Sequence, residues 1–306
     1  MLAIHCANLR KRYADVVAVD GLDLDVQAGE CFGLLGPNGA GKTTSIEILE
    51  GLNTPDAGDV EVLGMRWGTD DRTLRQRLGI QLQETQLNEK LTVEETLRLF
   101  RSFYIEGDEI DRVLARVQLE PKRKAQVGKL SGGQKQRLSV GCALVGKPDL
   151  LFLDEPTTGL DPQSRRQLWD LLEDFRREGG TILLTTHYMD EAAVLCDRLA
   201  IVDKGKVIAL GTPMELIRSL GAEHLLEFTV EGPDLTVEML QSLAGVQSAR
   251  KTESGYSVTT SSTHQAVPAL LGAISQSGGR LTLLNTHTAT LEDVFMHLTG
   301  RHLRDE

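Results

Sequence analysis

The sequence predicts an α/β protein in which a large first unit is followed by a small second one. Short apolar runs, typical of buried strands, alternate with helical patterns as far as about residue 220. After that point strand-like and helical stretches follow in the order β-α-β-β-α-β, which suggests a small ferredoxin-like α/β sandwich. We therefore expect two domains, residues 1–220 and 221–306.

Each predicted element of the first unit has its own sequence signal. The strand-like runs are Val16–Val26, Cys31–Leu35, Val60–Leu63, Leu150–Leu153, Ile182–Thr186, Leu199–Val202 and Val207–Leu210. Those nearest the N-terminus predict a small antiparallel sheet, and Gly205 in VDKGKV predicts a hairpin turn. Residues 87–129 lack such runs and repeat patterns such as VEETLRLFRSFY. A helical subdomain at about residues 87–146 is the expected result.

In the second unit the strand-like stretches are HLLEFTV, VQSARKT, YSVTTS and RLTLLNT. TVEMLQSL and AVPALLGAISQS are helical patterns between them, and TLEDVFMHLTG predicts a closing helix.

Composition limits the classes of protein to which the chain can belong. A length of 306 residues suits about two domains, and a net charge of −11 argues against a general nucleic-acid binder. The chain has no apolar run of the roughly 18 residues that span a bilayer, and MLAIHCANLRKRY lacks the layout of a signal peptide. The cysteines (Cys6, Cys31, Cys142 and Cys196) form no C-x-x-C pair, as expected of reduced thiols in a cytosolic protein.

A glycine-rich loop lies between the run Cys31–Leu35 and a helical pattern that begins at Lys42. It fits G-x-x-x-x-G-K-[ST], in which backbone N–H groups and a helix N-terminus hold phosphates. Lys42 is then placed to reach the β/γ-phosphates, and the Thr43 hydroxyl to ligate Mg²⁺. The candidate nucleotide-binding residues here are Gly36, Pro37, Asn38, Gly39, Ala40, Gly41, Lys42, Thr43 and Thr44. The loop alone leaves kinases, GTPases and ATPases open.

Two adjacent acids end the strand-like run Leu150–Leu153, in DLLFLDEPTTGLDP. An acid at the carboxyl end of a parallel strand beside a phosphate loop is where Mg²⁺ is ligated, so Asp154 is the candidate metal ligand. Glu155 is placed to polarise the attacking water as general base.

A second helix start is predicted in LSGGQKQRLSVGCALVGKPD. Ser131 is a suitable N-cap, and Gly132 and Gly133 leave the N–H groups of the first turn unobstructed. This helix start is a second candidate anion site.

These motifs, in this order, closely resemble the ATP-binding subunit of ABC transporters from about Leu2 to Leu220. The resemblance implies a P-loop NTPase core that binds ATP and Mg²⁺. It matches Tyr13 to the aromatic residue that stacks on adenine. It also matches Gln83 to the glutamine that touches Mg²⁺ and the attacking water. Gln81 competes for that role, since Leu82 stands where proline or an aromatic residue is usual, but the spacing to the following LTV favours Gln83.

The same resemblance assigns residues that act across a dimer. Ser131, Gly132, Gly133 and Gln134 are expected to contact the γ-phosphate bound by the opposite protomer, and Asp161 to couple the two sites. His187, after TILLTT, matches the γ-phosphate switch histidine.

The function implied is an ATPase that drives export through a separate transmembrane permease. It would work as a homodimer or with a paralogous ATPase, on the cytoplasmic face of the cell membrane. The closing segment resembles the C-terminal extension of daunorubicin-resistance-type and other ABC-2-type exporter ATPases. The alternatives are the ATPase of an importer, a non-transport ABC ATPase and a nucleotide sensor. Intact Glu155 argues against the sensor.

Overall fold

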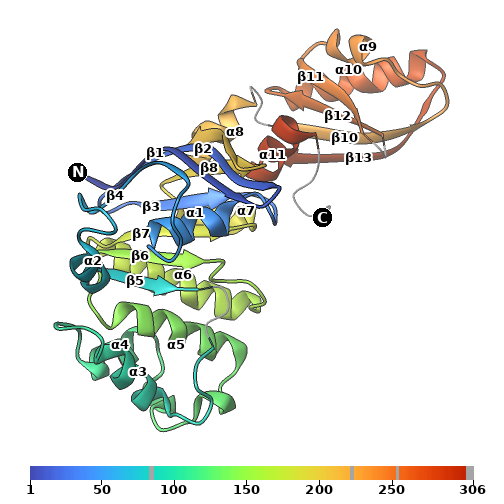
Figure 1. Cartoon of the computed structure of the whole chain (residues 1–306). Helices are drawn as coiled ribbons and strands as arrows, with labels where there is room; N and C mark the ends of the chain where they lie inside the picture. The colour runs from blue at the N-terminus through green and yellow to red at the C-terminus, as the bar shows by residue number, and fades with distance from the viewer. Residues whose placement is uncertain (83–85, 221–223, 253–254, 301–306) are drawn as a thin grey trace. The chain divides into compact units, whose positions relative to one another are not determined.

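In the computed structural model the described residues are 1–82, 86–220, 224–252 and 255–300 (Figure 1). They form two compact units that divide between Leu210 and Gly211. The boundary predicted from sequence, after residue 220, falls beyond the next helix, α8 (Pro213–Ser219).

A six-stranded sheet in the order β5-β6-β7-β3-β8-β9 is the centre of the first unit. Its strands are β3 (Cys31–Leu35), β5 (Leu78–Gln81), β6 (Leu150–Asp154), β7 (Thr181–Thr186), β8 (Arg198–Asp203) and β9 (Lys206–Gly211). β3 pairs in parallel with β7 and β8, and β6 with β5 and β7. The register sets Leu35 beside Thr186 and Asp154 beside Thr185. The segments that follow β3, β6 and β7 therefore leave the sheet at one edge, where α/β folds bind ligands.

An antiparallel sheet in the order β2-β1-β4 packs with the central sheet around one apolar core. Its strands are β1 (Leu2–Tyr13), β2 (Val16–Gln27) and β4 (Ala57–Val62). Helix α1 (Lys42–Leu49) lies in the same core through Ile46 and Leu49, both fully buried. The glycine loop is thus tied to both sheets.

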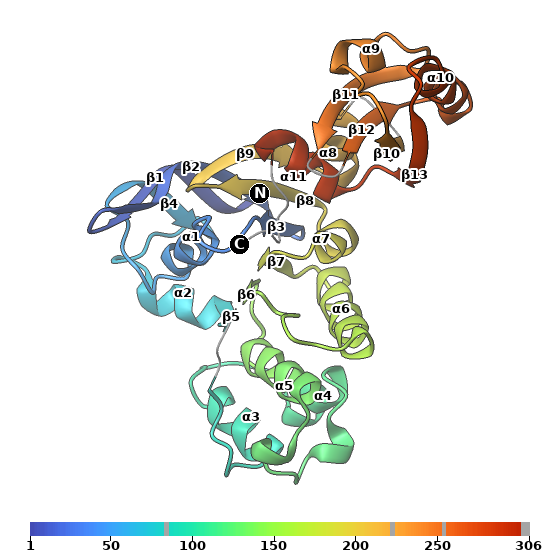
Figure 2. The same cartoon turned by 90° about the vertical axis from the view of Figure 1, so that its right-hand side faces the viewer.

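Helices cover the rest of the first unit. They are α2 (Asp71–Arg77), α3 (Val93–Arg101), α4 (Ile110–Arg116), α5 (Gly132–Leu144), α6 (Pro162–Arg177) and α7 (Met189–Leu195), with 3-10 turns at Glu120–Lys122 and Val127–Lys129. Figure 2 shows α3, α4 and α5 grouped beyond β5, where the helical subdomain was predicted. Within the part of the chain that the structure describes, every helix is too short or too polar to span a membrane.

The second unit has the element order that its sequence predicts. After α8 it consists of β10 (His224–Glu231), α9 (Val237–Gln241), β11 (Val246–Thr252), β12 (Gly255–Thr260), α10 (Thr263–Gln276), β13 (Arg280–Thr288) and α11 (Leu291–Thr299). The strands form an antiparallel sheet in the order β11-β12-β10-β13. Its core joins Phe228 and Val258 of the sheet to Leu240 of α9 and Leu270 of α10.

Candidate nucleotide-binding and hydrolysis site

The glycine loop packs so closely that side chains are excluded at two positions. A Cβ at Gly36 would overlap the carbonyl oxygen of Val202 in β8, and a Cβ at Gly41 that of Ala18 in β2. Gly41 also has φ +100°, which non-glycine residues rarely adopt. The glycines therefore let the loop approach strands of both sheets closely and lead directly into α1.

Lys42 is the first residue of α1 and is only 4% exposed. Its Nζ donates hydrogen bonds to the carbonyl oxygens of Gly36 (2.8 Å) and Pro37 (3.0 Å) and lies 3.6 Å from Glu155 Oε1. Burial lowers the pKa of Lys42, and the carboxylates of Glu155 and Asp154 oppose that shift. A buried cation therefore lies inside the curve of the loop, beside two acids.

Asp154 and Thr43 bring hard oxygen atoms together below the loop. Thr43 Oγ1 lies 3.5 Å from Asp154 Oδ1, which also accepts a hydrogen bond from the Thr185 hydroxyl. Burial raises the pKa of Asp154, and the Thr185 hydroxyl opposes this. A hydroxyl and a carboxylate suit Mg²⁺, which usually takes its remaining ligands from water and phosphate. Three or more His, Cys, Asp or Glu side chains that could hold a metal gather nowhere in the described residues.

Glu155 has the left-handed backbone conformation, with φ 47°, which costs energy for a residue with a side chain. Its Oε2 lies 3.1 Å from Nδ1 of His187, in ion-pair contact although poorly aligned as a hydrogen bond, and accepts from Thr158 Oγ1 at 3.2 Å. The contact with His187 is the main reason why the pKa of Glu155 is lowered, and burial opposes this shift. The carboxylate is therefore held ionised, the form that a general base requires.

The helix start at Ser131 forms a separate group. Ser131 caps α5, and its backbone N–H donates to Gln134 Oε1 at 3.0 Å in a reciprocal capping box. A Cβ at Gly132 would meet nothing, whereas one at Gly133 would overlap Ser164 of α6. Asp161 caps α6 by accepting from Gln163 and Ser164 N–H groups, each at 3.0 Å. The starts of α5 and α6 thus lie together.

Tyr13 ends β1 and is 44% exposed. The Asn53 amide donates to its hydroxyl, and Lys11 Nζ lies 5.4 Å from the ring centre. Its predicted contact with adenine stays a prediction.

Gln83, the predicted glutamine contact to Mg²⁺ and water, lies outside the described residues. Gln81, the alternative, ends β5 with 1% exposure and donates to the Leu82 carbonyl oxygen.

Sequence reasoning missed Thr185, whose hydroxyl joins the two acids of the site. It donates to Asp154 Oδ1 and accepts from the Glu155 backbone N–H at 3.0 Å. The only signal is a hydroxyl residue at the end of TILLTT, and its meaning depends on the pairing of β6 with β7.

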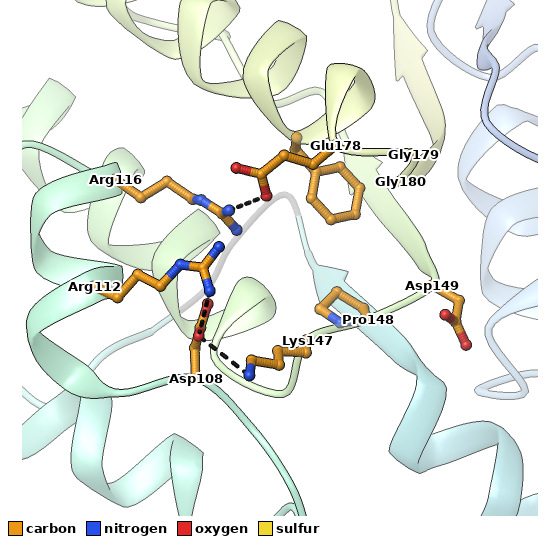
Figure 3. Close-up of a pocket in the computed structure, with 10 residues that line it drawn as sticks. Asp108, Arg112, Arg116, Lys147, Pro148, Asp149, Glu178, Gly179 and Gly180 are labelled. Carbon is orange, nitrogen blue, oxygen red and sulfur yellow. Dashed lines mark hydrogen bonds and ion pairs between the residues drawn. The ribbon is translucent and has the colours of Figure 1, made fainter.

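A cleft of about 250 Å³ lies between α4 and the end of α6, away from these motifs (Figure 3). Asp108 lies 3.5 Å from both Arg112 and Lys147, and Arg116 pairs with Glu178. Because these cations already have carboxylate partners, the cleft is a salt-bridged junction between helices.

The phosphate loop, the Mg²⁺-type oxygen pair and the Glu155–His187 contact meet at one edge of a parallel sheet, and a capped glycine helix start lies on the helical part. Together they define an ATP-binding cassette. Two family matches agree with that class. Residues 19–158 match the ABC transporter family, and residues 211–299 match the DrrA1-3-like ATP-binding protein, C-terminal domain.

Known proteins resemble the chain over most of its length. It is 42% identical over 304 residues to the Nod factor export ATP-binding protein I of Burkholderia lata, with 97% of each chain covered. Among solved structures, an ATP-binding subunit of an ABC transporter matches with TM-score 0.65 and 31% identity, over 72% of this chain and 93% of that one. A dimeric bacterial ABC transporter cassette matches with TM-score 0.62 and 25% identity, over 68% and 98%.

The chain belongs to the ATP-binding subunits of ABC transporters and is an ATPase of that family. Cassettes of this family bind ATP and form dimers, as the dimeric neighbour does.

Proposed function

We propose that this chain hydrolyses Mg-ATP to drive export through a separate membrane permease. The observation that carries the proposal is the cluster of the buried Lys42, Asp154 and Glu155 with the partly exposed His187 at the edge of the sheet. The relatives' name and the DrrA-type C-terminal match favour export over import and over a non-transport role. We propose the relatives' direction of transport for this chain. We do not propose their cargo, because the substrate path belongs to the membrane subunit.

In this proposal each residue of the cluster has one role. The glycine loop and Lys42 hold the β/γ-phosphates, and Thr43 and Asp154 hold Mg²⁺. Mg²⁺ supplies charge stabilisation for the phosphoryl oxygens when it is bound. Glu155 accepts the proton of the attacking water, and His187 keeps Glu155 ionised and reaches the γ-phosphate. Tyr13 stacks on adenine, and Gln83 contacts the metal and the water.

A second protomer completes the site. The space beside Gly132 is open, since a Cβ there would meet nothing, and the macrodipole of α5 favours an anion at this helix start. This end of the chain is the surface that closes on a partner's γ-phosphate, with Asp161 coupling the two sites. The partner is a second copy or a paralogous ATPase. The pair works on the cytoplasmic face of the membrane, and the division into residues 1–220 and 221–306 separates the cassette from its extension.

The permease docks in a groove of about 500 Å³ between α2, β5 and the end of α3. Phe100, Phe103 and Tyr104 line one side of it. Phe103 is 62% exposed, and its near neighbours in sequence Leu99 and Ile105 are 45% and 73% exposed, so the chain exposes apolar side chains around the end of α3. Such a patch on a chain of this family suits an apolar cytoplasmic segment of the membrane subunit. β5 ends at Gln81, two residues before Gln83 in the sequence.

Two substitutions test the catalytic assignment. Lys42→Ala removes the phosphate cation and is expected to weaken ATP binding. Glu155→Gln keeps the shape of the side chain but removes the base, so ATP binding is expected to persist while turnover falls about a hundredfold or more. Radiolabelled ATP binding and phosphate release measure the two effects.

Glu178→Gln is the matched control, because it removes a glutamate charge in the cleft away from the site. Its turnover is expected to equal that of the wild-type chain. Wild-type turnover in Glu155→Gln as well would refute the role of Glu155.

A further inference from the structure

Glu191 is a carboxylate buried behind the catalytic cluster. It lies in the first turn of α7, which begins just after His187, and its exposure is 0%. A buried carboxylate is costly unless donors surround it. It has no place among the sequence motifs of the nucleotide site.

The donors around Glu191 come from three elements. Trp169 Nε1 of α6 donates to Oε1 at 3.3 Å. The hydroxyls of Thr186, at the end of β7, and Thr157, after β6, lie beside the carboxylate, and Arg165 of α6 faces it from further away. Burial raises the pKa of Glu191, and all four of these groups oppose the rise.

One acceptor and one donor in this group lack a hydrogen bond. Glu191 Oε2 and Thr157 Oγ1 are both buried, and neither makes a hydrogen bond with suitable geometry in the structure. Thr157 has 0% exposure, so bulk solvent does not reach its hydroxyl. An acceptor and a donor left in this state gain free energy when a small movement brings them into line.

The groups around Glu191 also belong to the segments that carry the chemistry. Thr157 lies two residues after Glu155, and Thr186 directly precedes His187. Trp169 lies on α6, whose first turn is capped by Asp161. The Glu191 carboxylate therefore lies against the segment after Glu155, the segment before His187, and helix α6, which Asp161 caps.

We propose that Glu191 is a positioning residue for ATP hydrolysis. In the hydrolysing geometry the Thr157 hydroxyl donates to Glu191 Oε2. This contact fixes the segment after Glu155 against the segment before His187 and maintains the contact between the base and the histidine. The inference rests on the proposed roles of Glu155 and His187, and it adds a residue that touches neither nucleotide nor water.

Glu191→Gln tests this because it keeps the size of the side chain but replaces one acceptor oxygen with a donor amide. We expect kcat to fall about tenfold, while the ATP dissociation constant changes by less than about twofold. Asp190→Asn is the matched control: it removes a negative charge from the same turn of α7, where Asp190 is exposed and paired with Arg165. Its kcat is expected to stay within about twofold of wild type.

Thr157→Val separates positioning from packing and changes no charge. If Thr157 only packs, loss of an unsatisfied buried hydroxyl leaves kcat unchanged and keeps or raises Tm. We expect instead that kcat falls about threefold or more while Tm does not fall. This variant also decides the question if Glu191→Gln does not fold.

The double variant measures the coupling. Because both substitutions break one contact, its kcat is expected to match that of Glu191→Gln within about twofold. Wild-type kcat in Thr157→Val, or losses that multiply in the double variant, would overturn the inference and leave the proposed function intact. Absence of turnover in the wild-type chain would overturn both.

Discussion

Glu50 shows how strongly the fold changes the chemistry of a single residue. It follows the last turn of α1 with 2% exposure, and neither of its carboxylate oxygens makes a hydrogen bond within the part of the chain that the structure describes. Burial, with Asp154 and Glu47 as lesser causes, raises its pKa to about 8. Near neutral pH it is therefore largely a neutral acid in the folded protein.

That shift predicts a pH dependence of stability. Because the folded-state pKa lies above the ordinary value of 4.5, the stabilisation is complete below pH 4.5 and is lost as pH rises through about 8. Glu50→Gln removes this titration. Between pH 5 and pH 8 the free energy of unfolding should therefore shift in favour of the variant by about 3 to 4 kcal/mol. Urea denaturation at the two pH values measures it, and parallel pH profiles would contradict it.

The candidate site could be predicted from sequence where its residues belong to motifs with fixed spacing. Lys42, Thr43, Asp154 and Glu155 are of this kind, since the chemistry requires those residue types next to a strand end. Glu191 and Thr185 could not be predicted, because a buried acid and a hydroxyl gain their meaning only from the segments that β-pairing brings beside them.

At the scale of elements, the groove beside α3 predicts a variant that separates docking from hydrolysis. Phe103→Asp places a charge on the 62% exposed ring position. We expect it to abolish co-purification with a candidate membrane subunit encoded in the same gene neighbourhood. ATP turnover without that subunit should stay within about twofold of wild type, because the groove does not include the catalytic cluster.

Leu271→Asp is the control for this variant, since it adds the same charge at a 44% exposed position on α10. It is expected to co-purify normally. Normal co-purification of Phe103→Asp would remove the groove from the docking surface.

Most strands could be predicted from sequence because their apolar period is regular, and the two strands of the first unit that were missed show why others cannot. In β1 the pairing with β2 shifts register between Cys6 and Leu9, so the inward residues do not alternate evenly. β5 has only Leu78–Gln81, and one of its residues is a glycine, which weakens a strand pattern. Both strands form by pairing with strands that only the whole fold brings beside them.

At the scale of the whole molecule, we propose that the start of α5 and the glycine loop belong to different halves of a composite site. Ser131 and Gly133 lie with α6, and in the described residues no contact joins them to Lys42. A phosphate loop alone leaves the γ-phosphate open to water on one side. A second helix N-terminus supplies the missing anion contacts when two protomers close.

Complementation between two inactive variants tests this central claim most directly. Ser131→Arg blocks the helix start, and Lys42→Ala disables the phosphate loop. Each variant alone should be inactive. A mixture that forms heterodimers has one intact composite site per pair, and we expect it to recover part of the wild-type ATP turnover. The control is a heterodimer of wild-type chains with chains that carry both substitutions, which has no complete composite site. A mixture that stays inactive although heterodimers form, or a control as active as the mixture, would contradict the account.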